Sequence, residues 1–137
     1  MFKQICFFRK RPDMTMDQFL DYYENQHSQL SKRMGRAPSL PGAQRYVRRY
    51  LQPVNNPVTG TVIDPGYDCL MEIWWNSRED FEKSQAVISD PERLPAIKED
   101  ETNLFASHDN PVCIVTEEHD SPMGPNGEAT TVELKHG

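Results

Sequence analysis

The sequence contains no long hydrophobic segment and no concentration of positive charge. Its apolar runs are a few residues each, far below the roughly 20 needed to span a bilayer, and the first residues lack a signal-peptide core. The formal net charge is −6, from 15 Lys and Arg against 21 Asp and Glu. These features argue against a membrane or nucleic-acid partner, and we expect a cytoplasmic protein.

Cysteine and histidine are also scarce. The 3 cysteines lie in separate strand-like runs, at Cys6, Cys69 and Cys113. They form no C-x-x-C pair, so neither a disulfide framework nor a zinc site is indicated, and buried free thiols are expected. Outside the first helix the histidines fall in loops or the tail without ligand spacing, at His108, His119 and His136. We therefore expect no metal site.

The clearest pattern is a helix predicted from Thr15 to Met34. Its apolar positions recur at steps of three and four residues, at Met16, Phe19, Leu20, Tyr23, His27, Leu30 and Met34. Thr15 and Gln18 form a capping box at its start, and Gly35 is expected to end it. His27 lies on the inward face, and an imidazole there is a candidate for proton transfer. The alternative is a core histidine whose two ring nitrogens are bound by neighbours.

The remaining elements are strands and shorter helices. The strand-like segments are Phe2–Arg9, Gln44–Leu51, Tyr67–Trp75 and Pro111–Glu117. Ser77 and Asp80 repeat the capping pattern and open a second helix that ends at Asp90, and a further short helix is expected within Pro91–Phe105. The order β-α-β-β-α-β predicts a ferredoxin-like α+β fold, with an antiparallel sheet and both main helices on one face.

The predicted strands are apolar on both sides, so both faces of the sheet require cover. In a chain of 137 residues, only a second subunit can cover the face that has no helices. Two sheets stacked face to face give a dimeric α/β barrel with a pocket between each sheet and its helices. We therefore expect a homodimer. Glu72, a lone carboxylate in the third strand, requires a partner there.

Two segments stand apart from this core. Residues 52–66 are dense in turn-forming residues and are expected to form a long loop, with a small ribbon at Thr59–Ile63, that acts as a lid or contact surface. Residues 119–137 form a C-terminal extension beyond a domain of residues 1–118. Its strand-like stretch Thr130–Leu134 is expected to bind the partner subunit, and the alternative is a loose terminus.

Several stretches resemble the EthD-domain family in order and spacing. They are M-T-M-D-Q-F-L-D-Y-Y-E-N-Q-H-S-Q-L, P-G-A-Q-R-Y-V, Y-D-C-L-M-E-I-W-W-N-S-R-E-D-F, E-D-E-T-N-L-F-A and T-E-E. The similarity runs from about Phe2 to Glu118. The family usually has a Trp where this chain has Tyr22 or Tyr23, and the 52–66 loop and the tail are additions.

The resemblance implies a dimeric α/β barrel in a family with cofactor-free enzymes, including fungal polyketide dehydratases and cyclases. Relatives of the barrel include lactone isomerases, quinone-forming monooxygenases and haem enzymes, and the fold alone does not choose among them. A histidine on the first helix is the family's recurrent polar pocket residue. The resemblance assigns that role to His27 here. The other polar or aromatic residues expected near it are Tyr23, Tyr46, Glu72 and Trp74, followed by Asp100 and Glu101 as further candidates.

We expect a lyase or isomerase that moves a proton beside a carbonyl of a small hydrophobic, aromatic or polyketide-like substrate, with no cofactor. His27 is its expected acid/base, positioned by Glu72 or by a tyrosine hydroxyl such as that of Tyr46. The expected substrate-binding residues are Phe8, Tyr23, Trp74, Asp100, Leu104 and Phe105. The alternatives are a non-catalytic module that binds a small hydrophobic metabolite, and a cofactor-free or haem-dependent oxygenase.

Overall fold

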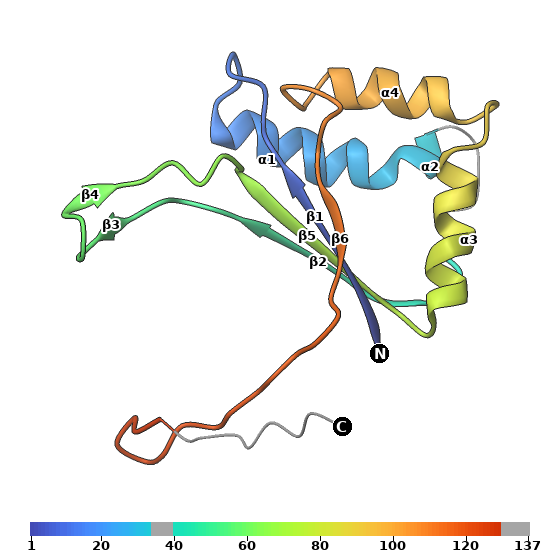
Figure 1. Ribbon diagram of the computed structural model, residues 1–137. Helices are drawn as coiled ribbons and strands as arrows, with labels where there is room; N and C mark the ends of the chain where they lie inside the picture. Colours follow the sequence, from blue (N-terminus) through green and yellow to red (C-terminus); the bar gives the residue numbers. More distant parts are fainter. Residues whose placement is uncertain (34–39, 130–137) are drawn as a thin grey trace.

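The computed structural model describes residues 1–33 and 40–129 (Figure 1). Its main sheet is antiparallel, in the order β2-β5-β1-β6. The strands are β1 (Phe2–Phe8), β2 (Ala43–Tyr50), β5 (Cys69–Trp75) and β6 (Val112–Ile114). The first and third strands of the predicted β-α-β-β-α-β order are therefore central. The predicted ferredoxin-like α+β fold is confirmed.

The predicted first helix is broken into three pieces. Helix α1 (Met16–Asn25) is followed by a 3-10 turn η1 (His27–Gln29) and by α2 (Leu30–Arg33). Ser28 Oγ donates to the Glu24 carbonyl at 2.6 Å, which competes with regular helical bonding at the break. Met34 and Gly35 lie outside the described residues. Leu20, predicted to face inward, is 40% exposed.

The predicted helix starts are confirmed. Thr15 Oγ1 accepts the backbone N–H of Gln18 at 3.1 Å, and the Gln18 side chain accepts that of Thr15 at 2.9 Å. These two bonds satisfy orphan donors of the first turn reciprocally. Ser77 accepts the backbone N–H of Asp80 at the start of α3 (Arg78–Ile88), and α4 (Leu94–Thr102) follows within the segment expected to hold a short helix.

The core lies between the sheet and the helices. Its buried residues are Cys6, Phe8, Phe19, Tyr23, Cys69, Met71, Ile73, Trp75, Leu104 and Phe105. Phe8 stacks on Phe105 with ring centroids 4.4 Å apart, and α3 enters the core through Phe81, whose ring lies 5.3 Å from that of Phe2. Both main helices therefore cover the same face. Cys113 is exposed on the edge strand, so the expectation of three buried thiols is wrong there.

No helix of the described residues lies on the opposite face of the sheet (Figure 1). Because side chains alternate along a strand, this face carries the residues between those of the core. These residues are Lys3, Ile5 and Phe7 of β1, Arg45, Val47 and Arg49 of β2, and Leu70, Glu72 and Trp74 of β5. We call this set the open face. It combines apolar side chains with charges of both signs.

The loop and the tail project away from the sheet (Figure 1). The loop contains a two-stranded ribbon of β3 (Asn55–Asn56) and β4 (Thr61–Val62), so the ribbon begins earlier than predicted. Asp64 near its base pairs with Arg9 at 3.0 Å. The tail begins beside β1, where Glu118 pairs with Lys3 at 2.9 Å, and its stretch Thr130–Leu134 lies outside the described residues. No helix among residues 1–33 and 40–129 combines the length and apolarity needed to cross a membrane.

Candidate functional site

The candidate site is centred on a contact between His27 and Asp100. The short turn η1 carries His27, and α4 carries Asp100 near its C-terminal end. Nδ1 of the imidazole lies 2.6 Å from Oδ2 of the carboxylate. The break after α1 places His27 at the start of a tighter turn, where its ring lies against the end of α4.

Asp100 is 4% exposed and receives further hydrogen bonds at its other oxygen. Tyr22 OH donates to Oδ1 at 2.7 Å, and Arg33 Nη1 donates to the same oxygen at 2.9 Å. Asn103 Nδ2 donates to Tyr22 OH at 3.2 Å, which holds the tyrosine in turn. The carboxylate is thus bound from α1, η1 and α2 together, and it fixes the start and end of the interrupted helix to α4.

These bonds decide the ionisation of Asp100. Burial alone would raise the pKa of its carboxyl, but the hydrogen bonds from His27, Tyr22 and Arg33 outweigh burial and lower the pKa to about 2. At neutral pH the group is therefore a carboxylate, which accepts hydrogen bonds and donates none. Nδ1 of His27 must carry the proton in this contact, so Nε2 is the unprotonated nitrogen of the neutral ring.

The ring of His27 is held between aromatic side chains. Its centroid lies 4.9 Å from that of Tyr23 and 5.5 Å from that of Phe105, both at steep angles. The His27 side chain is 17% exposed, so the ring remains within reach of solvent. In the described part of the chain, Nε2 has no hydrogen-bond partner. One ring nitrogen is therefore bound and the other is open. This differs from the alternative interpretation of His27, a core histidine with both ring nitrogens bound.

Among the described residues, neither Tyr23 nor Tyr46 makes a hydrogen bond to the His27 ring. Tyr23 OH and Tyr46 OH share a hydrogen bond of 2.9 Å. Burial raises the pKa of Tyr46 to about 12 and raises that of Tyr23 well above its ordinary value, so both hydroxyls stay protonated near neutrality. The expected tyrosine hydroxyl that positions His27 is therefore not Tyr46. Asp100 makes that contact.

The structure does not bring Glu72 and Trp74 to His27. Both side chains belong to the open face, opposite the helices. Glu72 accepts hydrogen bonds from Arg49 and from Trp74 Nε1, each at 2.7 Å. Trp74 in turn lies between two cations, with Lys3 Nζ 4.1 Å and Arg45 Cζ 4.7 Å from its ring centroid. The expected contact of Glu72 with His27 is wrong because strand alternation points residue 72 to the other side.

The apolar residues expected to line the substrate pocket occupy the core instead of an open wall. Phe8, Leu104 and Phe105 are 8%, 0% and 3% exposed. Phe105 contacts the His27 ring and Phe8 stacks on Phe105, so Phe8 and Phe105 pack behind the candidate site on its core side. Their role in substrate binding stays a prediction.

Sequence reasoning missed the groups that hold Asp100. Tyr22 was singled out only as the position of a family tryptophan, and Arg33 and Asn103 were not considered. Asn103 lies three residues after Asp100, which is a helical spacing and a weak signal, whereas Tyr22 lies five before His27, a spacing that gives none. Arg33 follows a helix break that the apolar pattern does not reveal.

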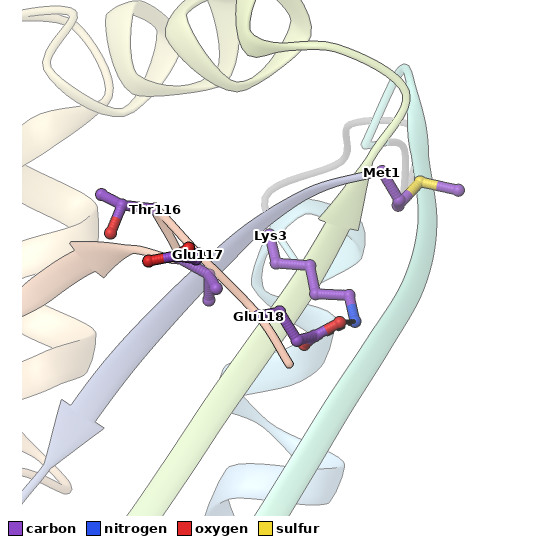
Figure 2. A pocket seen from close by; sticks show the side chains of 6 residues that line it. Met1, Lys3, Thr116, Glu117 and Glu118 are labelled. Atoms are coloured by element: carbon purple, nitrogen blue, oxygen red, sulfur yellow. Dashed lines mark hydrogen bonds and ion pairs between the residues drawn. The ribbon is translucent and has the colours of Figure 1, made fainter. Parts of the chain in front are cut away.

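A separate hollow of about 180 Å³ lies at the start of β1, beside the base of the tail (Figure 2). It is lined by Met1, Lys3, Val115, Thr116, Glu117 and Glu118. Figure 2 shows Lys3 reaching toward Glu118 across this hollow. None of its lining residues belongs to the cluster around His27. Within the described residues, no group of three or more His, Cys, Asp or Glu side chains is placed to hold a metal ion.

Solved structures share this fold at low sequence identity. An EthD family protein of Bacillus halodurans aligns with a TM-score of 0.52 and 16% identity, over 86% of this chain and 100% of that one. A protein of Arabidopsis thaliana aligns with a TM-score of 0.55 and 11% identity, over 89% and 100%. A hydroxynitrile lyase of Passiflora edulis aligns with a TM-score of 0.51 and 16% identity, over 88% and 96%. These likenesses establish the fold.

The sequence itself identifies the family. No curated protein gives a significant match to the sequence. The family model of the EthD domain matches residues 11–108, which include α1, β2, β5, α3 and α4 and both members of the His27–Asp100 pair. The match covers most of the chain and agrees with the motifs noted in the sequence. The chain belongs to the EthD domain family.

Proposed function

We propose that the protein is a lyase or isomerase in which His27 transfers a proton beside a carbonyl group of a small hydrophobic substrate. The observation that carries the proposal is the asymmetry of the imidazole: Asp100 binds Nδ1, and Nε2 has no partner in the described part of the chain. A histidine held in this way presents a basic nitrogen in a fixed direction. Asp100 is a positioning residue, since it acts through the imidazole.

The proposed reaction begins with removal of a proton from the carbon next to the carbonyl. His27 Nε2 takes that proton, and the electron pair of the C–H bond passes into an enolate. The imidazolium then returns the proton to a leaving hydroxyl, which departs as water, or to another carbon, which gives an isomer. The histidine ends each cycle in its starting form. Asp100 stabilises the imidazolium while it exists.

The surroundings of His27 suit an apolar substrate. Tyr23 and Phe105 flank the ring, and both are buried. A water-poor setting strengthens the interaction of the imidazolium with its carboxylate. One protein of the same fold is a hydroxynitrile lyase from Passiflora edulis, so this fold supports lyase chemistry elsewhere.

Solvent-deuterium exchange tests the proposal without knowledge of the natural substrate. The protein is incubated in deuterated water with benzoylacetone and a panel of aromatic β-hydroxyketones, and deuterium beside the carbonyl is measured by NMR. The wild type should accelerate exchange or dehydration of at least one compound, and His27→Gln should lower that rate by about 10²-fold or more. An equal rate in the variant, or no acceleration by the wild type, contradicts the proposal.

We also propose that the functional form is a homodimer packed through the open face. Ile5, Phe7, Val47 and Leu70 are only partly buried there. Apolar side chains gathered on an uncovered sheet face are typical of an interface. Arg45 and Arg49 share the face with Glu72, so a two-fold axis can set opposite charges against each other. Sedimentation at micromolar concentration should give a dimer, and a folded monomer contradicts this part of the proposal.

A further inference from the structure

Arg33 has hydrogen-bonding capacity that the described residues do not use. Its Nη1 donates to Asp100 Oδ1 at 2.9 Å and to the Gln26 carbonyl at 3.3 Å. The Tyr22 hydroxyl also lies near the guanidinium, but within the described residues no hydrogen bond is made by Nε or Nη2 with the geometry of the two Nη1 bonds. The side chain is 40% exposed, so these groups are reachable from solvent.

Two other arginines of the chain use their Nε and Nη2 groups together to bind a carboxylate. Arg48 donates from Nε and Nη2 to the two oxygens of Glu24, at 3.2 and 2.7 Å. Arg11 donates from the same two groups to the two oxygens of Asp13. The Nε–Nη2 edge of a guanidinium matches a carboxylate in this paired geometry. Arg33 is attached by Nη1, and among residues 1–33 and 40–129 no carboxylate occupies its Nε–Nη2 edge, which we call the vacant edge.

The vacant edge belongs to the candidate site. Arg33 and His27 bind the two different oxygens of one carboxylate, Oδ1 and Oδ2 of Asp100. The guanidinium and the imidazole are therefore fixed to one another through that group. A ligand that engages the Nε–Nη2 edge is therefore held by a side chain of the same cluster as His27.

We propose that the Nε–Nη2 edge of Arg33 binds a carboxylate of the substrate. This inference rests on the proposed function, and it narrows the substrate class to a hydrophobic or aromatic carboxylic acid. A chain with a net charge of −6 repels anions in general, so an anionic substrate requires a dedicated cation at the point of binding. Arg33 supplies a fixed charge together with two parallel N–H donors.

The test compares two small probes that differ in charge and little in shape, cinnamate and cinnamamide. Calorimetric titration measures the affinity of the full chain for each. The wild type should bind cinnamate about 10-fold or more tightly than cinnamamide. Arg33→Gln should abolish that preference while cinnamamide still binds, because the guanidinium that distinguishes the two probes is lost. Arg33→Lys should keep part of the preference, since a lysine supplies the charge without the paired donors.

Arg78→Gln is the matched control for net charge. Arg78 pairs with Glu82 on the exposed surface of α3, and its loss should not change the preference. The inference is overturned if the wild type has no preference or binds neither probe, if Arg33→Gln keeps the preference, or if that variant loses both probes equally. His27→Gln should retain the preference for cinnamate. If the preference depends on Arg33 but no exchange depends on His27, the proposed reaction fails and the carboxylate site stands.

Discussion

The Asp100 carboxylate lies 2.6 Å from His27 Nδ1 although 73 residues separate the two in the chain. The contact joins the interrupted first helix to α4, and it determines which imidazole nitrogen is open. The chemistry proposed for this protein depends on that arrangement more than on any other contact.

Asp100→Asn should lower the His27-dependent exchange rate by about 10²-fold or more, because an amide neither fixes the tautomer nor stabilises the imidazolium. It should also reduce the free energy of unfolding by about 1–3 kcal/mol, since the buried partner of Tyr22 and Arg33 loses its charge. Exchange rates and urea unfolding are measured on the same preparation.

Glu101→Gln is the matched control for that substitution. Glu101 also binds a histidine, with its Oε2 2.8 Å from His108 Nδ1, but that pair is exposed and outside the cluster. The control should keep the wild-type exchange rate. Comparable loss of exchange in both variants would show that the effect of Asp100→Asn is not specific to the site.

The stability of the fold should depend on pH through Asp100. Its pKa of about 2 in the folded state is below the ordinary value of 3.8, so its contribution is complete above pH 4 and is lost as the pH falls from about 4 to 2. The contribution amounts to about 2 kcal/mol at most. Urea unfolding of the wild type and Asp100→Asn at several pH values measures it. The difference between them should shrink across this window, and a constant difference contradicts the assignment.

Glu72→Gln should leave exchange at His27 unchanged, because Glu72 bonds Arg49 and Trp74 on the opposite face of the sheet. The substitution should lower stability by about 1 kcal/mol through weaker bonds to those two partners. Exchange rates per folded molecule are the measurement. A fall as large as that of His27→Gln would mean that Glu72 acts at the site despite its position.

Leu70→Glu should convert the proposed dimer into a monomer, because it buries a charge in the open-face contact without a partner. Val87→Glu is the control, since Val87 is 45% exposed on α3 and away from that face. Sedimentation of both variants gives the answer. A dimer that persists in Leu70→Glu places the interface elsewhere.

The sequence was sufficient for the fold because its local signals agree. The capping box at Thr15 and the N-cap bond of Ser77 mark both helix starts, and the strand Cys69–Trp75 is apolar on both sides, as a central strand must be. The break at His27 was not predictable from apolar spacing, because the 3-10 turn keeps the ring on the same side as a continuous helix would. A bond from Ser28 Oγ to the Glu24 carbonyl accompanies the break.

The sequence predicted the histidine of the candidate site but not the residue that binds it. Helical periodicity selected His27, and Asp100 was expected nearby, but as a substrate contact. The sequence predicts Glu72 or a tyrosine hydroxyl as the partner of His27, and Glu72 qualifies because a lone carboxylate in an apolar strand requires a partner. The sequence predicts a sheet face without helices but does not place Glu72 on it, where Arg49 and Trp74 donate hydrogen bonds to its carboxylate. Which face a strand residue occupies depends on where the helices pack, and one sequence does not reveal that directly.

The protonation of the His27 ring tests the central claim most directly. Nitrogen-15 NMR of the histidine-labelled protein, with the His27 signals identified by their loss in His27→Gln, reports which ring nitrogen carries hydrogen in the neutral form. The account predicts a proton on Nδ1 and an unprotonated Nε2 in the wild type, with this preference weakened in Asp100→Asn. A neutral ring with its proton on Nε2 would contradict the account, because the nitrogen proposed to accept the substrate proton would already carry one.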